Sequence, residues 1–338
     1  MNSAELPAES PLTSGEHTKY ASASDEQPTR TSLEMTGSIF LTGPTGYLGS
    51  RLLSRLAEDS SRRFVCLCRR KPADSQSGSI EFVQGDLLAR ESYAGAIAGC
   101  DTVVHLAAAT GKHGPAEYLR VNRDGTQALV AEARRAGVKR FLHVSSIAVK
   151  FLDKSRYPYA QSKEQAEAIV VKSGLRWVIV RPALILGKNA PGLKSLSRLA
   201  SLPVVPVFGD GRALVQPIFV DDLAECLAAI LKEDRFECET IEIGGPEVLS
   251  IEALLLSIRR AQGGRGSPVI HLPARPIAAC LGWMEPFLRP LLPFTAGQLA
   301  SFANAGTIDP DPWVEQQQSK MKRVDEILQS VANEQSPA

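Results

Sequence analysis

The sequence predicts a doubly wound α/β fold, in which helices cover both faces of a parallel sheet. From residue 37 to about residue 187, short and nearly continuous apolar runs alternate with helical patterns. Apolar runs of that kind are typical of parallel strands that are buried on both faces. The chain also has 338 residues and 44% hydrophobic content, so it can bury a large core without a disulfide or metal staple.

The expected elements follow one another in the order that this fold requires. Strands are expected at 38–42, 64–68, 80–83, 102–106, 141–145 and 177–180. Helices are expected at 47–57, 121–136 and 159–172, and glycines follow the last two, where a helix end favours them. Beyond Gly187 the pattern is less regular, with a helix expected at 221–231, a strand at 240–243 and a helix at 251–261.

The net charge of +1 is an average over two unlike parts of the chain. Residues 1–36 carry two basic and six acidic side chains, a net charge of −4, and they are rich in Ser, Thr and Pro without apolar periodicity. We expect this segment to be a disordered acidic tail. The absence of a basic excess argues against a nucleic-acid partner.

Cysteine spacing and hydropathy indicate the compartment. The six scattered cysteines form no four-ligand zinc pattern, so we expect free thiols, no metal and a reducing, cytoplasmic location. No apolar run reaches the ~20 residues of a membrane span. The nearest approach, 277–294, is interrupted by charged residues and prolines; core packing is the favoured interpretation, and contact with a membrane surface stays open.

A glycine-rich turn between the first strand and the first helix predicts a dinucleotide site. Gly43 permits the tight turn, Gly46 lets the backbone approach a pyrophosphate, and Gly49 permits close helix packing. The helix N-terminus then presents unpaired N–H groups to the anion. The residues predicted to contact the cofactor here are Gly43, Thr45, Gly46, Tyr47, Leu48 and Gly49.

The end of the second strand favours NADP over NAD. NAD-selective sites usually carry a carboxylate there, which accepts a hydrogen bond from the ribose 2′-hydroxyl. This chain has Arg69 and Arg70 instead, and guanidinium groups suit a 2′-phosphate. Two solvated surface arginines remain the alternative, so NAD stays possible.

A Tyr-x-x-x-Lys pair predicts proton transfer. Tyr159 and Lys163 share one helix face, and a nearby ammonium would lower the pKa of a phenol from its usual value near ~10. Ser146 closes the fifth strand at the carboxyl end of the sheet, where it could donate to a substrate oxygen. Lys112 and His113 lie in a loop that could cover a substrate, although a surface role is favoured.

With these motifs the chain resembles the extended short-chain dehydrogenase/reductases, the NAD-dependent epimerase/dehydratase family with a Rossmann domain. The resemblance spans about residues 38–275. The motifs that carry it are TGPTGYLG from Thr42, GDL from Gly85, HLAA from His105, VNRDGT from Val121, VSSIAV from Val144, YAQSK from Tyr159, RPALILG from Arg181, FVDD from Phe219 and IGGPE from Ile243.

The resemblance implies roles for individual residues. Asp86 and Leu87 would contact the adenine, Ala107 would lie along the cofactor, and Pro182 would lie near the nicotinamide. Ser146, Tyr159 and Lys163 would be catalytic, and Asn122 would act structurally or in the proton relay. The implied domains are the tail 1–36, a Rossmann domain at 37–187, a smaller substrate-binding lobe interleaved with the sheet at 188–320, and a C-terminal helix and tail at 321–338.

Two departures distinguish the chain from the sugar-nucleotide enzymes of this family. Lys150 and Phe151 stand where many of them have Tyr-Gly, and Val215 stands where they have an arginine for the diphosphate, while Arg212 is present but offset from that position. The pattern looks more like reductase and steroid-dehydrogenase-like members, and like relatives of a complex I accessory subunit. We therefore expect an NAD(P)-dependent oxidoreductase acting on a small molecule. A nucleotide-sugar epimerase or dehydratase and a non-catalytic NADP-binding assembly subunit are the alternatives, and a homodimer stays open.

Overall fold

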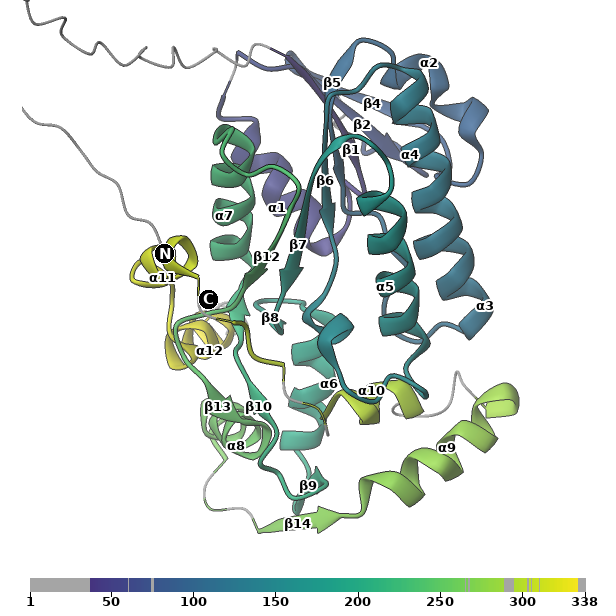
Figure 1. The fold of residues 1–338 in the computed structure, drawn as a ribbon. Coiled ribbons are helices and arrows are strands. Elements are labelled where there is room, and N and C mark those ends of the chain that lie inside the picture. The colour runs from purple at the N-terminus through teal and green to yellow at the C-terminus, as the bar shows by residue number, and fades with distance from the viewer. Residues whose placement is uncertain are drawn as a thin grey trace, which may run out of the picture. The chain divides into compact units, whose positions relative to one another are not determined.

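The computed structural model describes residues 37–59, 61–73, 76–264, 266, 268–288, 295–302, 304, 306–309 and 311–333. The predicted tail at 1–36 lies outside them. An eight-stranded sheet runs in the order β12-β7-β6-β5-β1-β2-β4-β3 (Figure 1). Its strands are β1 (Ser38–Thr42), β2 (Phe64–Cys68), β3 (Gln76–Ser77), β4 (Ile80–Gln84), β5 (Cys100–His105), β6 (Arg140–Val144), β7 (Arg176–Pro182) and β12 (Glu239–Ile243).

All neighbouring strands in this sheet are parallel except β3 and β4. The side-chain alternation of β1 shows how the sheet is buried, because Ile39 and Leu41 join one hydrophobic cluster and Phe40 joins another. Successive side chains of a strand point to opposite faces, so both faces of the sheet are covered. The predicted doubly wound parallel sheet is confirmed.

Helices form one layer on each face (Figure 1). On one side α1 and α7 lie side by side, and side chains of α11 join their cluster. The bounds are Tyr47–Leu56 for α1, Val220–Lys232 for α7 and Pro312–Gln318 for α11. The other side is covered by α2 (Ala94–Ile97), α4 (Gly125–Arg135) and α5 (Pro158–Val171).

The helix expected at 121–136 is divided in the structure. It begins as α3 (Pro115–Tyr118), continues as the π-helix η2 (Leu119–Asp124) and ends as α4. Apolar periodicity does not distinguish a π turn from an α turn, so the sequence pattern did not indicate it. Two 3-10 helices, η1 (Arg90–Ser92) and η3 (Ile147–Lys150), complete the connections around the sheet.

The remaining elements form a C-terminal lobe with its own hydrophobic cluster, built from side chains of α6, α8, α10 and α12. Three two-stranded pairings belong to this half: β10 with β13, β11 with β8, and β14 with β9. The bounds are β8 (Ile185–Leu186), α6 (Pro191–Ala200), β9 (Val205–Phe208), β10 (Leu214–Val215), β11 (Ile218–Phe219), β13 (Leu249–Ser250), α8 (Ile251–Ala261), β14 (Val269–Leu272), α9 (Ala274–Leu288), α10 (Ala296–Phe302) and α12 (Val324–Asn333).

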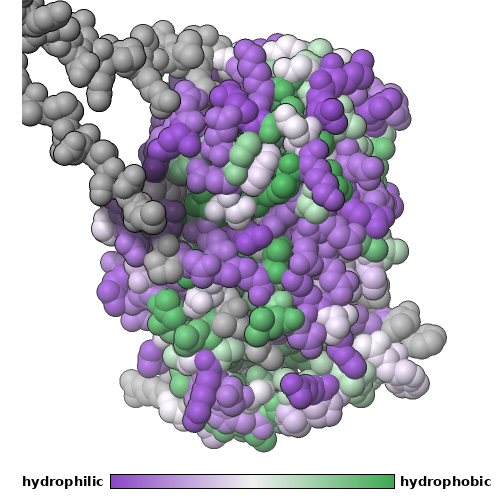
Figure 2. All heavy atoms as spheres, viewed as in Figure 1, coloured by the Kyte–Doolittle hydropathy of each residue, from purple (hydrophilic) through white to green (hydrophobic). Residues whose placement is uncertain are grey.

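The surface and the thiols complete the description. Figure 2 shows hydrophobic patches that interrupt the hydrophilic surface, and the lower ones lie where Figure 1 draws the C-terminal lobe. All six cysteines are free, as expected. Among the described helices, none combines the length and the apolar character that crossing a bilayer requires.

Candidate active site

The glycine loop between β1 and α1 is held by backbone contacts. Gly43 has a φ of +73°, and a Cβ there would lie 2.8 Å from the backbone nitrogen of Ala107 at the end of β5. A Cβ at Gly49 would overlap the carbonyl oxygen of Gly43. Only glycine fits the space at these two positions, so α1 packs directly on the loop that precedes it.

The N-terminus of α1 fits an anionic group. Its N-cap is Gly46, which supplies no side-chain cap, and its first turn holds no acidic residue. Thr45 and Gly46 are exposed, while Tyr47 and Leu48 are half-buried. The hydroxyl of Tyr47 is buried with no hydrogen-bond partner among the described residues, and burial raises its pKa to about 12. An uncapped helix start behind a glycine loop suits the pyrophosphate of a dinucleotide.

The predicted adenosine end of the site combines exposed cations with buried contacts. Arg69 and Arg70 follow β2 and are both exposed. Asp86 accepts a hydrogen bond from the backbone N–H of Leu88 at 2.9 Å. Leu87 is buried and its side chain lies where a Cβ at Gly125 would sit, so it packs beneath the surface rather than at an open edge.

The predicted catalytic residues converge at the carboxyl end of β6. Ser146 caps η3, and its Oγ accepts from the N–H of Ala148 at 3.2 Å. Tyr159 lies in the first turn of α5, and its pKa is raised to about 12 because burial outweighs the lowering effect of its hydrogen bond with Ser146. Lys163, one turn later, donates to the carbonyl of Val144 at 2.6 Å.

The direction of the pKa of Tyr159 differs from the sequence-based expectation. Lys163 was expected to lower it, but the ammonium is held at the Val144 carbonyl, and Lys163 is not among the groups that shift the phenol. Burial in turn lowers the pKa of Lys163 to about 8. Desolvation therefore dominates both groups in this structure.

Hydrogen bonds of Asn122 connect the π-helix η2 to α5, the helix that carries Tyr159 and Lys163. The side chain is 1% exposed; its Oδ1 accepts from the N–H of Ala109 at 2.7 Å, and its Nδ2 donates to Ser162 Oγ at 2.9 Å. Ser162 lies between Tyr159 and Lys163 on α5. The amide thus joins the loop after β5 to the helix that carries the predicted acid–base, which favours a structural role.

Two buried histidines lie next to Lys163, and their contact with each other could not be predicted from the sequence. The ring centroids of His105 and His143 are 5.1 Å apart. His105 is held between Thr42 Oγ1 at 2.7 Å and Thr126 Oγ1 at 2.9 Å. His143 Nε2 lies 3.5 Å from Lys163 Nζ. Burial is the main cause that lowers the pKa of both rings, to about 3 for His105 and well below its usual value for His143, with the Lys163 ammonium adding to it.

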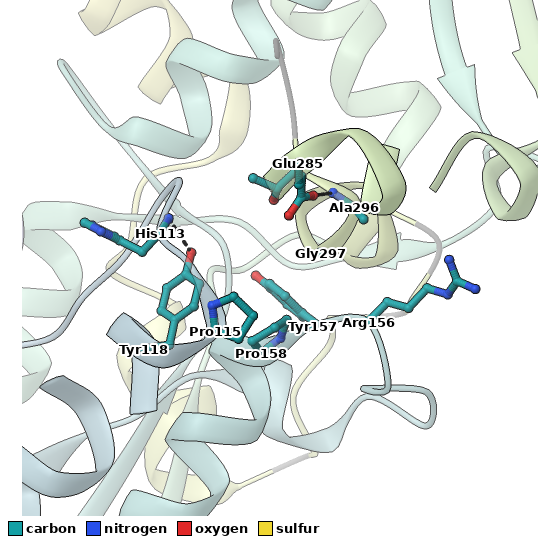
Figure 3. Close-up of a pocket in the computed structure, with 11 residues that line it drawn as sticks. His113, Pro115, Tyr118, Arg156, Tyr157, Pro158, Glu285, Ala296 and Gly297 are labelled. Carbon is teal, nitrogen blue, oxygen red and sulfur yellow. Dashed lines mark hydrogen bonds between the residues drawn. The ribbon is translucent and has the colours of Figure 1, made fainter. Parts of the chain in front are cut away.

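A pocket of 160 Å³ lies next to Tyr159, between the start of α5 and residues of α9 and α10 (Figure 3). Tyr118 and Tyr157 line it, and their ring centroids lie 5.8 Å and 5.7 Å from that of Tyr159. His113, the loop residue noted from the sequence, also lines it. The full lining is His113, Pro115, Tyr118, Arg156, Tyr157, Pro158, Gly282, Glu285, Thr295, Ala296 and Gly297.

Val215 and Gln216 are built into the lobe. Val215 is buried and pairs with Leu249 across β10 and β13. Gln216 is also buried; its Nε2 donates to the carbonyl of Gly245 at 2.9 Å, and its Oε1 accepts from the N–H of Ile308 at 3.2 Å. These two side chains therefore offer no cation to a substrate diphosphate, and the exposed Arg212 lies three residues before Val215.

A match to a protein-family model shows which family the chain belongs to. Residues 39–244, more than half of the chain, match the NAD dependent epimerase/dehydratase family. The chain belongs to that family. Its members share an NAD-binding Rossmann fold, and the predicted relation to the extended short-chain dehydrogenase/reductases is confirmed.

Two reductases are among the similar curated proteins. A ceramide reductase of Caulobacter vibrioides is 35% identical over 199 residues, 58% of this chain and 61% of that protein. A 4-hydroxy-2-methyl-3-oxo-4-farnesyl-3,4-dihydroquinoline-1-oxide ketoreductase of Stigmatella aurantiaca is 35% identical over 169 residues, 44% of this chain and 51% of that protein. A Mycobacterium tuberculosis protein is 28% identical, and the match spans only 24% of its length.

The solved structures that resemble the chain show the fold. A nucleoside-diphosphate-sugar epimerase from Staphylococcus aureus superposes with a TM-score of 0.67 at 20% identity, covering 86% of this chain and 99% of that one. A dTDP-glucose 4,6-dehydratase from Streptomyces venezuelae, with NAD bound, gives a TM-score of 0.59 at 24% identity, covering 70% and 84%.

Proposed function

We propose that the chain is an NADP-dependent reductase that exchanges hydride between the nicotinamide and a carbonyl or alcohol carbon of a small molecule. The observation that carries this proposal is the meeting of Ser146, Tyr159 and Lys163 at the carboxyl end of β6. The glycine loop opens at the same edge of the sheet, where ligands of doubly wound folds bind. The six free thiols favour a cytoplasmic location.

The protein's own groups would handle the proton and the position of the substrate. Bound nicotinamide supplies or accepts the hydride. Ser146 would orient the substrate oxygen by a hydrogen bond, and Tyr159 would donate its hydroxyl proton to that oxygen during reduction. The Lys163 ammonium donates to the Val144 carbonyl in this structure and would turn towards the phenolate once the proton has left; with a pKa of about 8 it is still mainly charged at neutral pH. The rings of Tyr118 and Tyr157 would limit water around the phenol.

Val215 is the observation that favours a reductase over a nucleotide-sugar enzyme. A diphosphate requires cations or a helix N-terminus, and this position offers a buried aliphatic side chain. The names of the two reductase relatives point the same way, and one of them includes a farnesyl group, which is an apolar chain. An epimerase or dehydratase remains the second candidate because of the fold shared with such enzymes.

Replacement of Tyr159 tests the mechanism. In a screen of aliphatic and aromatic ketones that monitors NADPH absorbance, Tyr159→Phe should reduce turnover by about 100-fold or more, with NADPH affinity unchanged. Equal turnover in the variant would refute the role of Tyr159. Tightly retained cofactor and conversion of nucleotide sugars without net NADPH consumption would instead establish the epimerase candidate.

The cofactor preference has its own test. Arg69→Ala combined with Arg70→Ala should weaken NADPH binding by about tenfold or more and leave NADH binding nearly unchanged, because only NADPH carries the 2′-phosphate. Titration of both nucleotides against both proteins measures this. Tighter binding of NADH than of NADPH by the unmodified protein would contradict the proposed preference for NADP.

A further inference from the structure

The helix α9 is apolar on both of its faces. Its outward face exposes Pro276, Ala279, Cys280 and Trp283, which follow the i, i+3, i+4, i+7 spacing of one helix side, and Trp283 is 77% exposed. Its inward face buries Ala278 and packs Leu281 on the lobe cluster. A helix that is apolar all round is normally covered on every side by protein core or by lipid.

The few charges around the outward face are mainly cationic. Within α9 the only ionisable acid, Glu285, turns inward, where its carboxylate accepts from the N–H of Ala296 at the start of α10 (Figure 3). Arg275 lies in the first turn of the helix, and Arg156 lies on the loop before α5. The pKa of Asp153 is lowered mainly by its hydrogen bonds with Ser155, and both arginines are near enough to add to that effect. Neither arginine forms an ion pair with another described residue, and the carboxylate of Asp153 accepts from Ser155.

The size of the exposed face argues against a protein partner. From Pro276 to Trp283 the face is one helix wide and about 12 Å long, and its four exposed side chains present on the order of 300 Å². A stable protein interface buries about 800 Å² on each partner. A bilayer surface has no such requirement, because a single helix lying in the interface with an amphipathic aromatic ring is a common anchor.

We propose that the outward face of α9 docks on an anionic bilayer surface, with Trp283 at the interface and Arg275 and Arg156 beside the lipid headgroups. Gly282 and Glu285 of the same helix line the pocket next to Tyr159. If the proposed reductase function holds, docking brings that pocket to apolar substrates dissolved in the membrane. Docking itself does not depend on that function.

Binding to vesicles tests the proposal directly. Vesicles of phosphatidylcholine and phosphatidylglycerol, and of phosphatidylcholine alone, are titrated with the full chain; bound protein is measured by sedimentation and tryptophan emission. Trp313 is 8% exposed and Trp177 is partly buried, so a blue shift reports on Trp283. We expect binding and a blue shift with the anionic vesicles, and weaker binding to the neutral ones.

Three variants sharpen this test. Trp283→Ser should lose the blue shift and bind roughly tenfold more weakly. Arg275→Gln should bind about fivefold more weakly, with a shallower salt dependence. The control is Val171→Ser at the far end of α5, where an apolar side chain is also exposed (48%), and it should bind like the unmodified protein. Circular dichroism verifies that each variant is folded.

Several outcomes would overturn the proposal. The first is that the unmodified protein does not bind anionic vesicles, and the second is that Trp283→Ser binds them as tightly as the unmodified protein does. The third is a blue shift that depends on protein concentration without vesicles, which would show that a second copy covers the helix. Because sedimentation requires neither cofactor nor turnover, failure here leaves the proposed reaction standing. Tyr159→Phe should bind vesicles normally even if it has no activity.

Discussion

Backbone atoms touch backbone atoms around the Gly43–Gly49 loop, whereas the pocket under α9 and α10 is lined mainly by side chains. In the sheet region, buried amide, hydroxyl and imidazole groups are joined in hydrogen bonds of 2.7–2.9 Å. In the lobe, short two-stranded pairings and helices leave Trp283 exposed. The two regions therefore differ in what fixes them: backbone contacts and buried hydrogen bonds around the loop, and side-chain packing around the pocket. We propose that the pocket selects the substrate, because side chains that line a pocket can vary without disturbing the backbone of the sheet.

The largest effect expected from this contrast is at Gly49. Gly49→Ala should prevent close packing of α1 on its loop, because the added methyl group meets a backbone oxygen that cannot move alone. We expect a loss of about 3 kcal/mol or more in the free energy of unfolding and the loss of dinucleotide binding. Thermal unfolding and NADPH titration measure the two effects.

Gly95→Ala is the matched control for that substitution. Gly95 lies in the helix α2, and a Cβ there would meet no atom within 4 Å. Alanine is favoured over glycine in helices, so the control should be neutral or slightly stabilising. If both variants behave alike, the loop is not as tightly packed as the geometry indicates.

The next effect concerns Asn122. Asn122→Ala leaves the N–H of Ala109 and the hydroxyl of Ser162 without their buried partner. We expect a loss of ~2–4 kcal/mol in the free energy of unfolding, measured by urea denaturation. Asn122→Asp keeps the acceptor for the N–H of Ala109, but it replaces the donor to Ser162 and to the Ala109 carbonyl with a buried carboxylate oxygen, so at neutral pH it should cost at least as much. Equal stability of Asn122→Ala and the unmodified protein would contradict the buried network.

A smaller effect is expected from acid. The pKa of His105 falls from about 6.5 in the unfolded chain to about 3 in the folded one, so below pH 6.5 the unfolded state binds the proton and the folded state does not. Stability is therefore lost as the pH falls from 6.5 towards 3, by ~2 kcal/mol from His105 between pH 7 and pH 5. His105→Gln should show a shallower loss in urea denaturation at the two pH values; an unchanged slope would exclude His105 as its source.

The smallest effect belongs to the pocket. A Cβ at Gly297 would lie 2.8 Å from the ring of Tyr157 and 3.2 Å from the carbonyl oxygen of Arg156, whereas a Cβ at Gly282 would make an ordinary contact of 3.8 Å. Gly297→Ala should raise the KM of the carbonyl substrate by roughly threefold to tenfold with unchanged NADPH affinity. Gly282→Ala should change neither. A change in NADPH affinity would show that the lobe also positions the cofactor.

The same contrast separates what the sequence predicts well from what it does not. The bounds of α1, α5 and α8 follow from apolar spacing, caps and glycines, which are local signals, and the structure agrees within one or two residues. The pairing of β14 with β9 and the position of α9 over the start of α5 depend on residues distant in the sequence. No local pattern encodes them.

The candidate site divides in the same way. Ser146 follows the carboxyl end of β6, and Tyr159 lies in the first turn of the next α-helix, so both could be expected at the same edge of the sheet. The partner of Lys163 could not, because the carbonyl of Val144 is available only once β6 and α5 have packed. The contact between the rings of His143 and His105 likewise depends on the register between β5 and β6, where these residues are direct neighbours.

The strand β12 has a consequence for synthesis on the ribosome. It pairs in parallel with β7 but is separated from it by the first part of the lobe and by α7. Until β12 leaves the exit tunnel, the nascent chain presents β7 with an unpaired edge, which is a template for aggregation. A fragment truncated after Gly187 would keep that edge permanently. The dinucleotide-binding half should therefore aggregate when it is produced without the rest of the chain.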